Sequence, residues 1–494
     1  MMSFDMPVHW EDAEKLGTRL RQEGRREDAV DFYRASLQRF PENIVLLNGL
    51  GLVLMDANRP GEARSVLEQA ERHSPRTPAL VFNLGNAMRL GGDPAGAITM
   101  YERALSLGLD IPELFNNLGV ALQESERWGD ALRMFQESLQ RNSRYVPALA
   151  NSGYSMIQIG RPDDAVDVLR RALRVEPAYA DAHWLLSHAL LITGQWPEGW
   201  DEYEWRWHKM KTVAYHRGTP ESRWAGEDID GKTILLYAEQ GAGDAVQFVR
   251  YASLVKARGA NVMVECHEEL VSLFRGVDGV SEAHARGTTL PPYDVACPLL
   301  SLPSVFRTTV GSIPGVVPYL VADPHRVTRW RRVLEPFRNR LCVGLVWAGN
   351  AAHVNDRKRS LPPGLLAPLA SMPGVQIFSL QKSAAGDSRC VIPASLSLID
   401  WTDEFHDFAD TAALISELDL VIAGDTAVAH VAGALGKPVW VMLPYAPDWR
   451  WLLARGDSDW YPSMRLFRQP VPGDWRSVVE SLCTQIAQFP RISL

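Results

Sequence analysis

The stretch that decides the fold of the C-terminal part is LDLVIAGDTAVAHVAGALGKP, which spans residues 418–438. It begins with a short apolar run, turns at Gly424, and continues as an Ala-rich segment before a second apolar run opens at Pro438. A strand, a helix and a further strand in this order predict a parallel sheet with helical crossovers.

Apolar runs of the same kind recur outward from this stretch and are separated by helical or loop segments. They cover residues 233–238, 261–266, 342–347, 375–380, 418–423 and 438–443. We therefore expect two Rossmann-like α/β halves, residues 231–325 and 326–494, with a cleft between them. Because ligands of such sheets bind beyond the carboxyl ends of the strands, the residues just after each run are the candidates for a site.

The first two fifths of the chain form an internal repeat of 34 residues. A shift of this length aligns Gly17, Gly51, Gly85, Gly119, Gly153 and Ser187, and likewise Ala29, Ala63, Ala97, Ala131, Ala165 and Gly199. Small residues at these places let paired helices approach closely. The pattern resembles the tetratricopeptide repeat, and it predicts an α-solenoid of about six repeats over residues 10–210 with a linker over residues 211–230.

An aromatic cluster, residues 195–207, ends the sixth repeat. Aromatic residues at helical spacing are more often core than ligand site, so we expect this segment to cap the solenoid and pack against the next domain.

Composition excludes several functional classes. The chain has 494 residues with 46% hydrophobic and 22% charged residues, which indicates two to four globular domains. Its net charge of -8 argues against a nucleic-acid or membrane-surface binder. No run approaches the roughly 18 apolar residues of a membrane span, and residues 1–15 contain no apolar stretch of the kind found in secretory signals. We therefore expect a cytoplasmic protein.

The first candidate site follows the first apolar run, where residues 239–244 read EQGAGD. The glycines permit a tight turn that leaves Asp244 at the start of a helix facing the cleft. A carboxylate there is either an ordinary helix cap or a general base that takes the proton of an acceptor hydroxyl.

The second candidate site is Asp425, Thr426 and His430, in which Thr426 and His430 lie one helical turn apart on the same face. The free N–H groups at that helix start favour a diphosphate, and both side chains can add donors. The alternative is a helix cap with a buried histidine whose hydrogen bonds are satisfied.

A third candidate group contains Asn350 and two basic residues that follow neighbouring strands, Arg359 and Lys382. They are either a solvated loop or cations that neutralise a diphosphate leaving group without a metal. We therefore expect no metal site.

These motifs together resemble the heptosyltransferase family of GT-B glycosyltransferases over residues 231–494. The resemblance implies that Asp244 is the catalytic base, that Asp425, Thr426 and His430 bind the nucleotide diphosphate, and that Lys382 contacts a phosphate. It also implies an inverting reaction that needs no metal, and no cofactor is expected because the nucleotide sugar is a substrate. The chain departs from the family by having Ala427, where glycine is usual.

The runs WAGN (347–350) and PDWRWL (447–452) are similar to a bacterial subgroup of repeat-bearing transferases. That wider group is linked to protein glycosylation, including that of flagellin.

Asparagines recur at the same spacing of 34 residues, at Asn83, Asn117 and Asn151, and predict an inner ladder whose amides could hold a peptide backbone. Eukaryotic O-linked N-acetylglucosamine transferases resemble the chain in this ladder and in joining repeats to a transferase. The alternative is that asparagine is simply common at this place of the repeat. Asn48 falls out of register, which leaves three expected rungs.

We expect a glycosyltransferase that moves a sugar from a nucleotide-sugar donor to a protein hydroxyl, with the acceptor bound along the repeats. One alternative is transfer to a glycolipid or polysaccharide, with the repeats recruiting partners. Another is a repeat scaffold whose transferase fold does not catalyse. The sequence leaves the sugar, the acceptor and the oligomeric state open.

Overall fold

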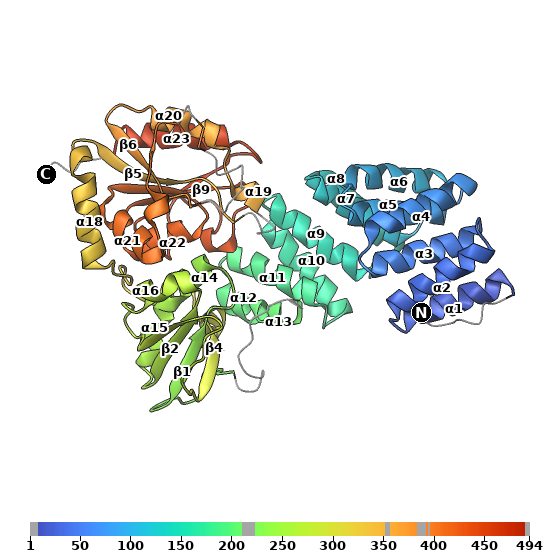
Figure 1. Cartoon of the computed structure of the whole chain (residues 1–494), viewed down its shortest axis with the longest axis horizontal. Coiled ribbons are helices and arrows are strands. Elements are labelled where there is room, and N and C mark those ends of the chain that lie inside the picture. The colour runs from blue at the N-terminus through green and yellow to red at the C-terminus, as the bar shows by residue number, and fades with distance from the viewer. Residues whose placement is uncertain (1–7, 210–222, 351–355, 383–391, 394–395, 490–494) are drawn as a thin grey trace. The chain divides into compact units, whose positions relative to one another are not determined.

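The computed structural model describes residues 8–209, 223–350, 356–382, 392–393 and 396–489 (Figure 1). The chain divides into two compact units, residues 1–185 and 186–494. Most of the expected linker over residues 211–230 lies outside the described residues.

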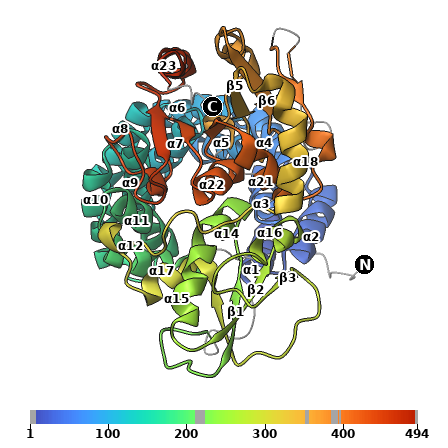
Figure 2. The ribbon, with the colours of Figure 1, turned by 90° about the vertical axis from the view of Figure 1, so that its left-hand side faces the viewer.

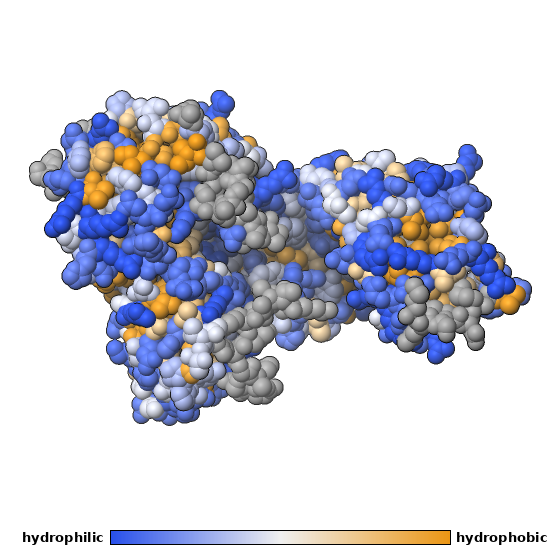
Figure 3. Space-filling model, in the orientation of Figure 1, coloured by the Kyte–Doolittle hydropathy of each residue, from blue (hydrophilic) through white to orange (hydrophobic). Residues whose placement is uncertain are grey.

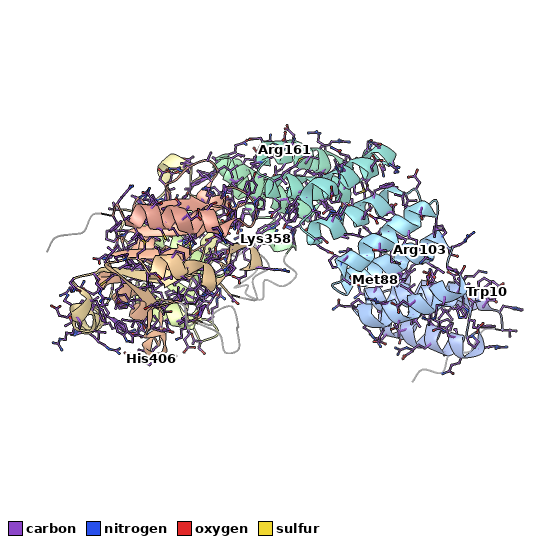
Figure 4. All side chains as sticks on the ribbon, turned by 90° about the horizontal axis from the view of Figure 1, so that it is seen from above. Trp10, Met88, Arg103, Arg161, Lys358 and His406 are labelled. Carbon is purple, nitrogen blue, oxygen red and sulfur yellow. The ribbon has the colours of Figure 1, made fainter. Side chains whose placement is uncertain are left out.

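Paired helices build the repeat region. They are α1 (Trp10–Gln22), α2 (Arg26–Arg39), α3 (Ile44–Asp56), α4 (Pro60–His73), α5 (Pro78–Leu90), α6 (Pro94–Ser106), α7 (Pro112–Glu124), α8 (Trp128–Arg141), α9 (Val146–Gln158), α10 (Pro162–Val175), α11 (Ala180–Ile192) and α12 (Trp196–Tyr203). Proline at the first helical turn starts several of them, because that position needs no N–H donor. Figure 4 shows the side chains of two neighbouring helices, with Met88 of α5 and Arg103 of α6 labelled.

The recurring glycines are places of close helix contact. A Cβ atom on Gly85 would lie 2.7 Å from Tyr101 Cε1, and one on Gly119 would lie 2.5 Å from Phe135 Cε1. Both aromatic rings are fully buried. The predicted reason for the small residues is therefore confirmed: the glycine leaves the space that the next helix fills with a large side chain.

Two parallel sheets follow in the second unit. The first has the order β3-β2-β1-β4, with β1 (Thr233–Tyr237), β2 (Asn261–Cys266), β3 (Glu282–Ala285) and β4 (Val295–Pro298). The second has the order β10-β9-β8-β5-β6-β7, with β5 (Leu341–Val346), β6 (Val375–Ser379), β7 (Ile399–Asp400), β8 (Leu420–Gly424), β9 (Val439–Leu443) and β10 (Met464–Arg468). The predicted fold class, an α-solenoid followed by two Rossmann-like α/β halves, is confirmed and is consistent with a GT-B domain.

Helices connect and cover these strands. They are α13 (Arg206–Lys209), α14 (Ala242–Phe248), α15 (Ala252–Lys256), α16 (Val271–Phe274), α17 (Leu302–Val305), α18 (Pro324–Leu334), α19 (Asp356–Arg359), α20 (Ala367–Ala370), α21 (Phe408–Glu417), α22 (Ala427–Ala434) and α23 (Trp475–Ile486). The segment that joins the halves contains α18, which Asp323 caps by accepting from the backbone N–H of His325 at 2.8 Å.

The aromatic segment at the end of the last repeat packs within the second unit, as expected. Trp196 stacks on Trp460 with ring centroids 5.2 Å apart, and Trp200 meets Trp449 edge to face at 5.1 Å. Both α12 tryptophans are 1% exposed. These rings are core, and they join α12 to the second α/β half.

The visible face in Figure 3 is mainly hydrophilic, and its apolar residues form separate patches. Among the described residues, no helix has both the length and the apolar character that crossing a membrane requires.

We predict that Gly119→Val lowers the free energy of unfolding by about 1–3 kcal/mol, because the added carbons meet the rigid ring of Phe135. Gly129→Ala is the matched control, since a Cβ on Gly129 of α8 has nothing within 4 Å. It should raise the stability by up to about 1 kcal/mol through helix propensity. Urea unfolding of the full chain followed by far-UV circular dichroism measures both, and equal effects of the two variants would contradict the close contact.

Candidate functional site

The starts of two helices meet where the two α/β halves face each other. Helix α14 follows β1 and helix α22 follows β8, and the two helices lie against each other (Figures 1 and 2). A Cβ atom on Gly243 would lie 3.0 Å from His430 Cδ2 and 3.4 Å from Ala427 Cα. A glycine at this position therefore allows the two helix starts to approach so closely.

Strand order explains why these turns form a site. In the first sheet the chain runs from β1 to β2 and β3 on one side and then returns to place β4 on the other side of β1. In the second sheet it runs from β5 to β6 and β7 and then returns to place β8 on the other side of β5. Such points of reversal open a crevice at the carboxyl ends of the strands. Asp244 follows β1, and Asp425 follows β8. The structure thus brings together the first two candidate sites that the sequence predicts.

Asp244 has two partners. Its Oδ2 accepts a hydrogen bond from the backbone N–H of Gly241 at 3.0 Å, so the carboxylate does cap α14. Its Oδ1 forms an ion pair with Arg450. The side chain is 21% exposed. Each carboxylate oxygen has a second lone pair, so the cap and the ion pair leave Asp244 the capacity to accept a further proton or hydrogen bond.

Arg450 links the two halves. It lies in the short 3-10 helix Trp449–Trp451, and its Nη1 donates to Asp448 Oδ1 at 2.8 Å while its Nε donates to Gln247 of α14. Burial disfavours the charged guanidinium, but Asp448 and Asp244 outweigh this effect and raise the pKa of Arg450. The buried charge is therefore fully compensated by carboxylates.

Sequence reasoning noted the run PDWRWL but assigned no role to Arg450 or Asp448. A usable signal was present, because an arginine between two tryptophans, close to an aspartate, is rarely buried without a partner.

Asp425 and Thr426 begin α22. Burial raises the pKa of the Asp425 carboxyl to about 6, and the neighbouring Asp448 adds to this shift while Arg359 and Arg450 oppose it. Thr426 is the N-cap residue, yet its side chain makes no cap hydrogen bond. Within the described parts of the chain its Oγ1 is shielded from solvent and has no hydrogen-bond partner. The hydroxyl is therefore suitably placed for a ligand at the helix start.

His430 is buried one turn further along α22. Burial, with Arg450 as the next cause, lowers its pKa to about 3, so the ring is neutral near pH 7. Tyr319 donates its hydroxyl proton to the carbonyl oxygen of Val246 at 3.0 Å, and the Tyr461 hydroxyl lies 2.9 Å from His430 Nδ1, where either atom can be the donor. In the tautomer in which Tyr461 donates to Nδ1, the proton of the neutral ring resides on Nε2, where it can donate to a ligand.

Arg359 lies beside the end of β8. A Cβ atom on Gly424 would come within 3.4 Å of the Arg359 carbonyl oxygen, and Arg359 Nε donates to Asp356 Oδ1 at 3.2 Å. The guanidinium is close enough to lower the pKa of both Asp425 and His430, although burial is the larger influence on each. Asn350, also predicted here, is exposed at the end of its described segment.

Lys382 follows β6, and its ammonium donates to the carbonyl oxygen of Phe405 at 2.5 Å. Its contact with a phosphate stays a prediction.

The three predicted ladder asparagines lie on α5, α7 and α9, within the first unit. Each donates to an asparagine of the preceding repeat: Asn83 to Asn48 at 2.8 Å, Asn117 to Asn86 at 2.9 Å, and Asn151 to Asn116 at 3.0 Å. Asn48 thus joins the ladder although its sequence register is off by one residue. The amides bridge successive repeats, and a primary amide has a further N–H with which to bind a peptide.

Among the residues that the structure describes, no group of three or more His, Cys, Asp or Glu side chains could hold a metal ion.

Comparisons with known proteins find matches to both the repeat region and the C-terminal part of the chain. Tetratricopeptide repeat family models match residues 48–111, 113–146 and 151–204. The model of glycosyltransferase family 9 (heptosyltransferase) matches residues 406–442, which include β8 and α22. The chain therefore combines tetratricopeptide repeats with a C-terminal segment similar to heptosyltransferases.

One curated relative is Protein FlbA of Caulobacter vibrioides, which is 29% identical over 323 residues, or 61% of this chain and 54% of that protein. The chain thus spans about half the length of this relative.

Solved structures resemble the chain over part of its length. The crystal structure of MamA is 21% identical with a TM-score of 0.31 and covers 36% of this chain and 99% of its own. A thermophilic TPR protein of Thermus thermophilus is 18% identical with a TM-score of 0.33 and covers 37% and 98%. These low scores carry no weight for function.

We predict that His430 makes stability depend on pH. Because its pKa is lowered from 6.5 to about 3, the unfolded chain binds a proton between these values that the folded chain does not. The free energy of unfolding therefore falls as pH decreases from about 6.5 toward 3, by up to about 1.4 kcal/mol per pH unit for this group. His430→Gln should lack this component. Urea titrations of both proteins from pH 7 to pH 5 measure it, and identical pH slopes would contradict the buried neutral ring.

Proposed function

We propose that this chain is a glycosyltransferase that moves a sugar from a nucleotide-sugar donor to a hydroxyl group of a protein. The observation that carries the proposal is the contact between α14 and α22. It places the carboxylate of Asp244 opposite the start of α22, which suits a diphosphate. The match of residues 406–442 to glycosyltransferase family 9 supports it.

The donor diphosphate binds at the start of α22. Free backbone N–H groups and the positive end of the helix attract the phosphates. The Thr426 hydroxyl, which lacks a protein partner among the described residues, and Nε2 of neutral His430 add hydrogen bonds. Arg359 supplies a nearby positive charge. These groups stabilise the charge that develops on the leaving group.

Asp244 acts as the general base in this proposal. As the acceptor oxygen bonds to the anomeric carbon of the sugar, the acceptor proton passes to Asp244. The bond from that carbon to the diphosphate breaks, and the diphosphate leaves with the electron pair. A single displacement of this kind inverts the anomeric configuration and uses no metal ion.

The acceptor in this proposal is a protein segment bound along the repeats. Asn83, Asn117 and Asn151 recur at equal spacing on successive first helices. Such a ladder of amides can bind a peptide backbone without selecting one sequence, which suits an enzyme for flexible Ser/Thr segments of flagellin or another surface protein. We place this reaction in the cytoplasm.

The donor reaction tests the enzyme. We expect the chain to consume one member of a panel of UDP-, GDP-, ADP- and CMP-sugars, with activity retained in EDTA. Asp244→Asn should lower the rate by about 10²–10⁴-fold, and Thr426→Val should raise the donor KM by about fivefold through the loss of one hydrogen bond. Asp323→Asn is the matched control, because asparagine also caps a helix. Turnover of no donor, or full activity of Asp244→Asn, would refute the proposal.

The acceptor is tested with the same donor and a synthetic pool of Ser/Thr-containing peptides. The double variant Asn117→Ala, Asn151→Ala should weaken peptide transfer about 30-fold, at roughly 1 kcal/mol for each of the two lost hydrogen bonds, while donor hydrolysis stays constant. Asn142→Ala, at an exposed asparagine beyond α8, is the control. Transfer to glycolipid vesicles but not to peptides would instead favour a lipid acceptor.

A further inference from the structure

The ion pair between Asp244 and Arg450 rests on a segment from the end of the repeat region. This segment, α12–α13, comprises residues 196–209 and belongs to the second compact unit. It contacts the turn that carries Asp244 on one side and the short helix that carries Arg450 on the other.

The contact with the Asp244 turn is polar and buried. Arg206, which is fully buried, donates to Glu239 at 3.0 Å and to Ser301 at 2.7 Å. Gln240 donates to the hydroxyl of Tyr203 at 3.2 Å. Glu239 and Gln240 directly precede the Gly241–Asp244 turn, so α12–α13 holds the chain where it leaves β1.

The contact with the Arg450 helix is aromatic. Trp449 meets Trp200 at 5.1 Å and Tyr203 at 6.3 Å between ring centroids. Trp200 also donates through Nε1 to the carbonyl oxygen of Thr308 at 3.0 Å, which ties it to the first half. Rings this large and fully buried fix the backbone of the Trp449–Trp451 helix.

Three consecutive residues of that helix therefore face three different partners. Trp449 packs on α12, Arg450 pairs with Asp244, and Trp451 stacks on His430 with ring centroids 5.6 Å apart. The guanidinium also has a fixed geometry, because Asp448 and Gln247 hold its other nitrogens. A shift of the helix would move the base and the diphosphate-side histidine together.

We infer that Arg450 is a positioning residue that holds the carboxylate of Asp244 in its working orientation, and that α12–α13 braces both members of this pair. The inference rests on the proposed function for its catalytic consequence. The α12–α13 segment thereby completes the transferase site structurally.

Arg450→Ala tests the positioning role with the donor and acceptor found above. We expect kcat to fall about 100-fold with the donor KM changed far less, because a misplaced base affects the chemical step more than ground-state binding. Millimolar guanidinium should restore part of the activity, and Arg450→Lys should retain more activity than Arg450→Ala. Arg326→Lys is the matched control, since it alters an Arg–Asp pair on α18 away from the site.

A thermal double-mutant cycle tests the pair without any activity. If Arg450 holds Asp244, the double variant Asp244→Asn, Arg450→Ala should lose several degrees less in Tm than the sum of the losses of the two single variants. Tyr203→Phe, which removes only the hydroxyl that accepts from Gln240, should lower kcat severalfold in an active enzyme.

The outcomes separate the two proposals. If the wild type is inactive but the Tm losses of the Asp244 and Arg450 variants are not additive, the proposed function is refuted and the positioning of Asp244 by Arg450 stands. An active wild type with additive Tm losses, or with no rescue by guanidinium, refutes the inference about Arg450 and leaves the proposed function standing.

Discussion

The meeting of the two α/β halves depends on a buried positive charge, the guanidinium of Arg450. It is 9% exposed and pairs with Asp244 of the first half and Asp448 of the second. A buried charge is tolerated only when its partners are correctly placed, and the removal of one partner leaves the others uncompensated. The two α/β halves therefore meet in an arrangement that satisfies this cation, and the aromatic residues on either side of it pack accordingly.

The same arrangement separates the chemical roles of the neighbouring groups. Burial keeps His430 neutral and raises the pKa of Asp425 to about 6, whereas Asp448 beside Arg450 has its pKa lowered despite its own burial. Acidic and basic side chains within one small volume thus differ in protonation because of their surroundings. A neutral imidazole can donate a hydrogen bond to a phosphate without adding a charge next to Arg450.

Much of the fold could be predicted from local pattern. The runs at residues 233–238 and 261–266 match β1 and β2, and those at 342–347 and 375–380 match β5 and β6 within one residue at each end. The strands that the pattern missed are β3, β4, β7 and β10. β3 and β7 are edge strands of two to four residues, which is too short for a clear apolar run. In β10 the arginines 465 and 468 interrupt the apolar pattern.

By itself the sequence determined the repeat spacing, the two α/β halves and the candidate residues Asp244, Asp425, Thr426 and His430, because spacing, turns and caps are local properties of the chain. Only the tertiary structure decided that Arg450 joins Asp244 across 206 residues, that Lys382 bonds to Phe405, and that the ladder includes Asn48. These contacts depend on how helices and sheets pack. No local pattern encodes which distant side chain neutralises a buried charge.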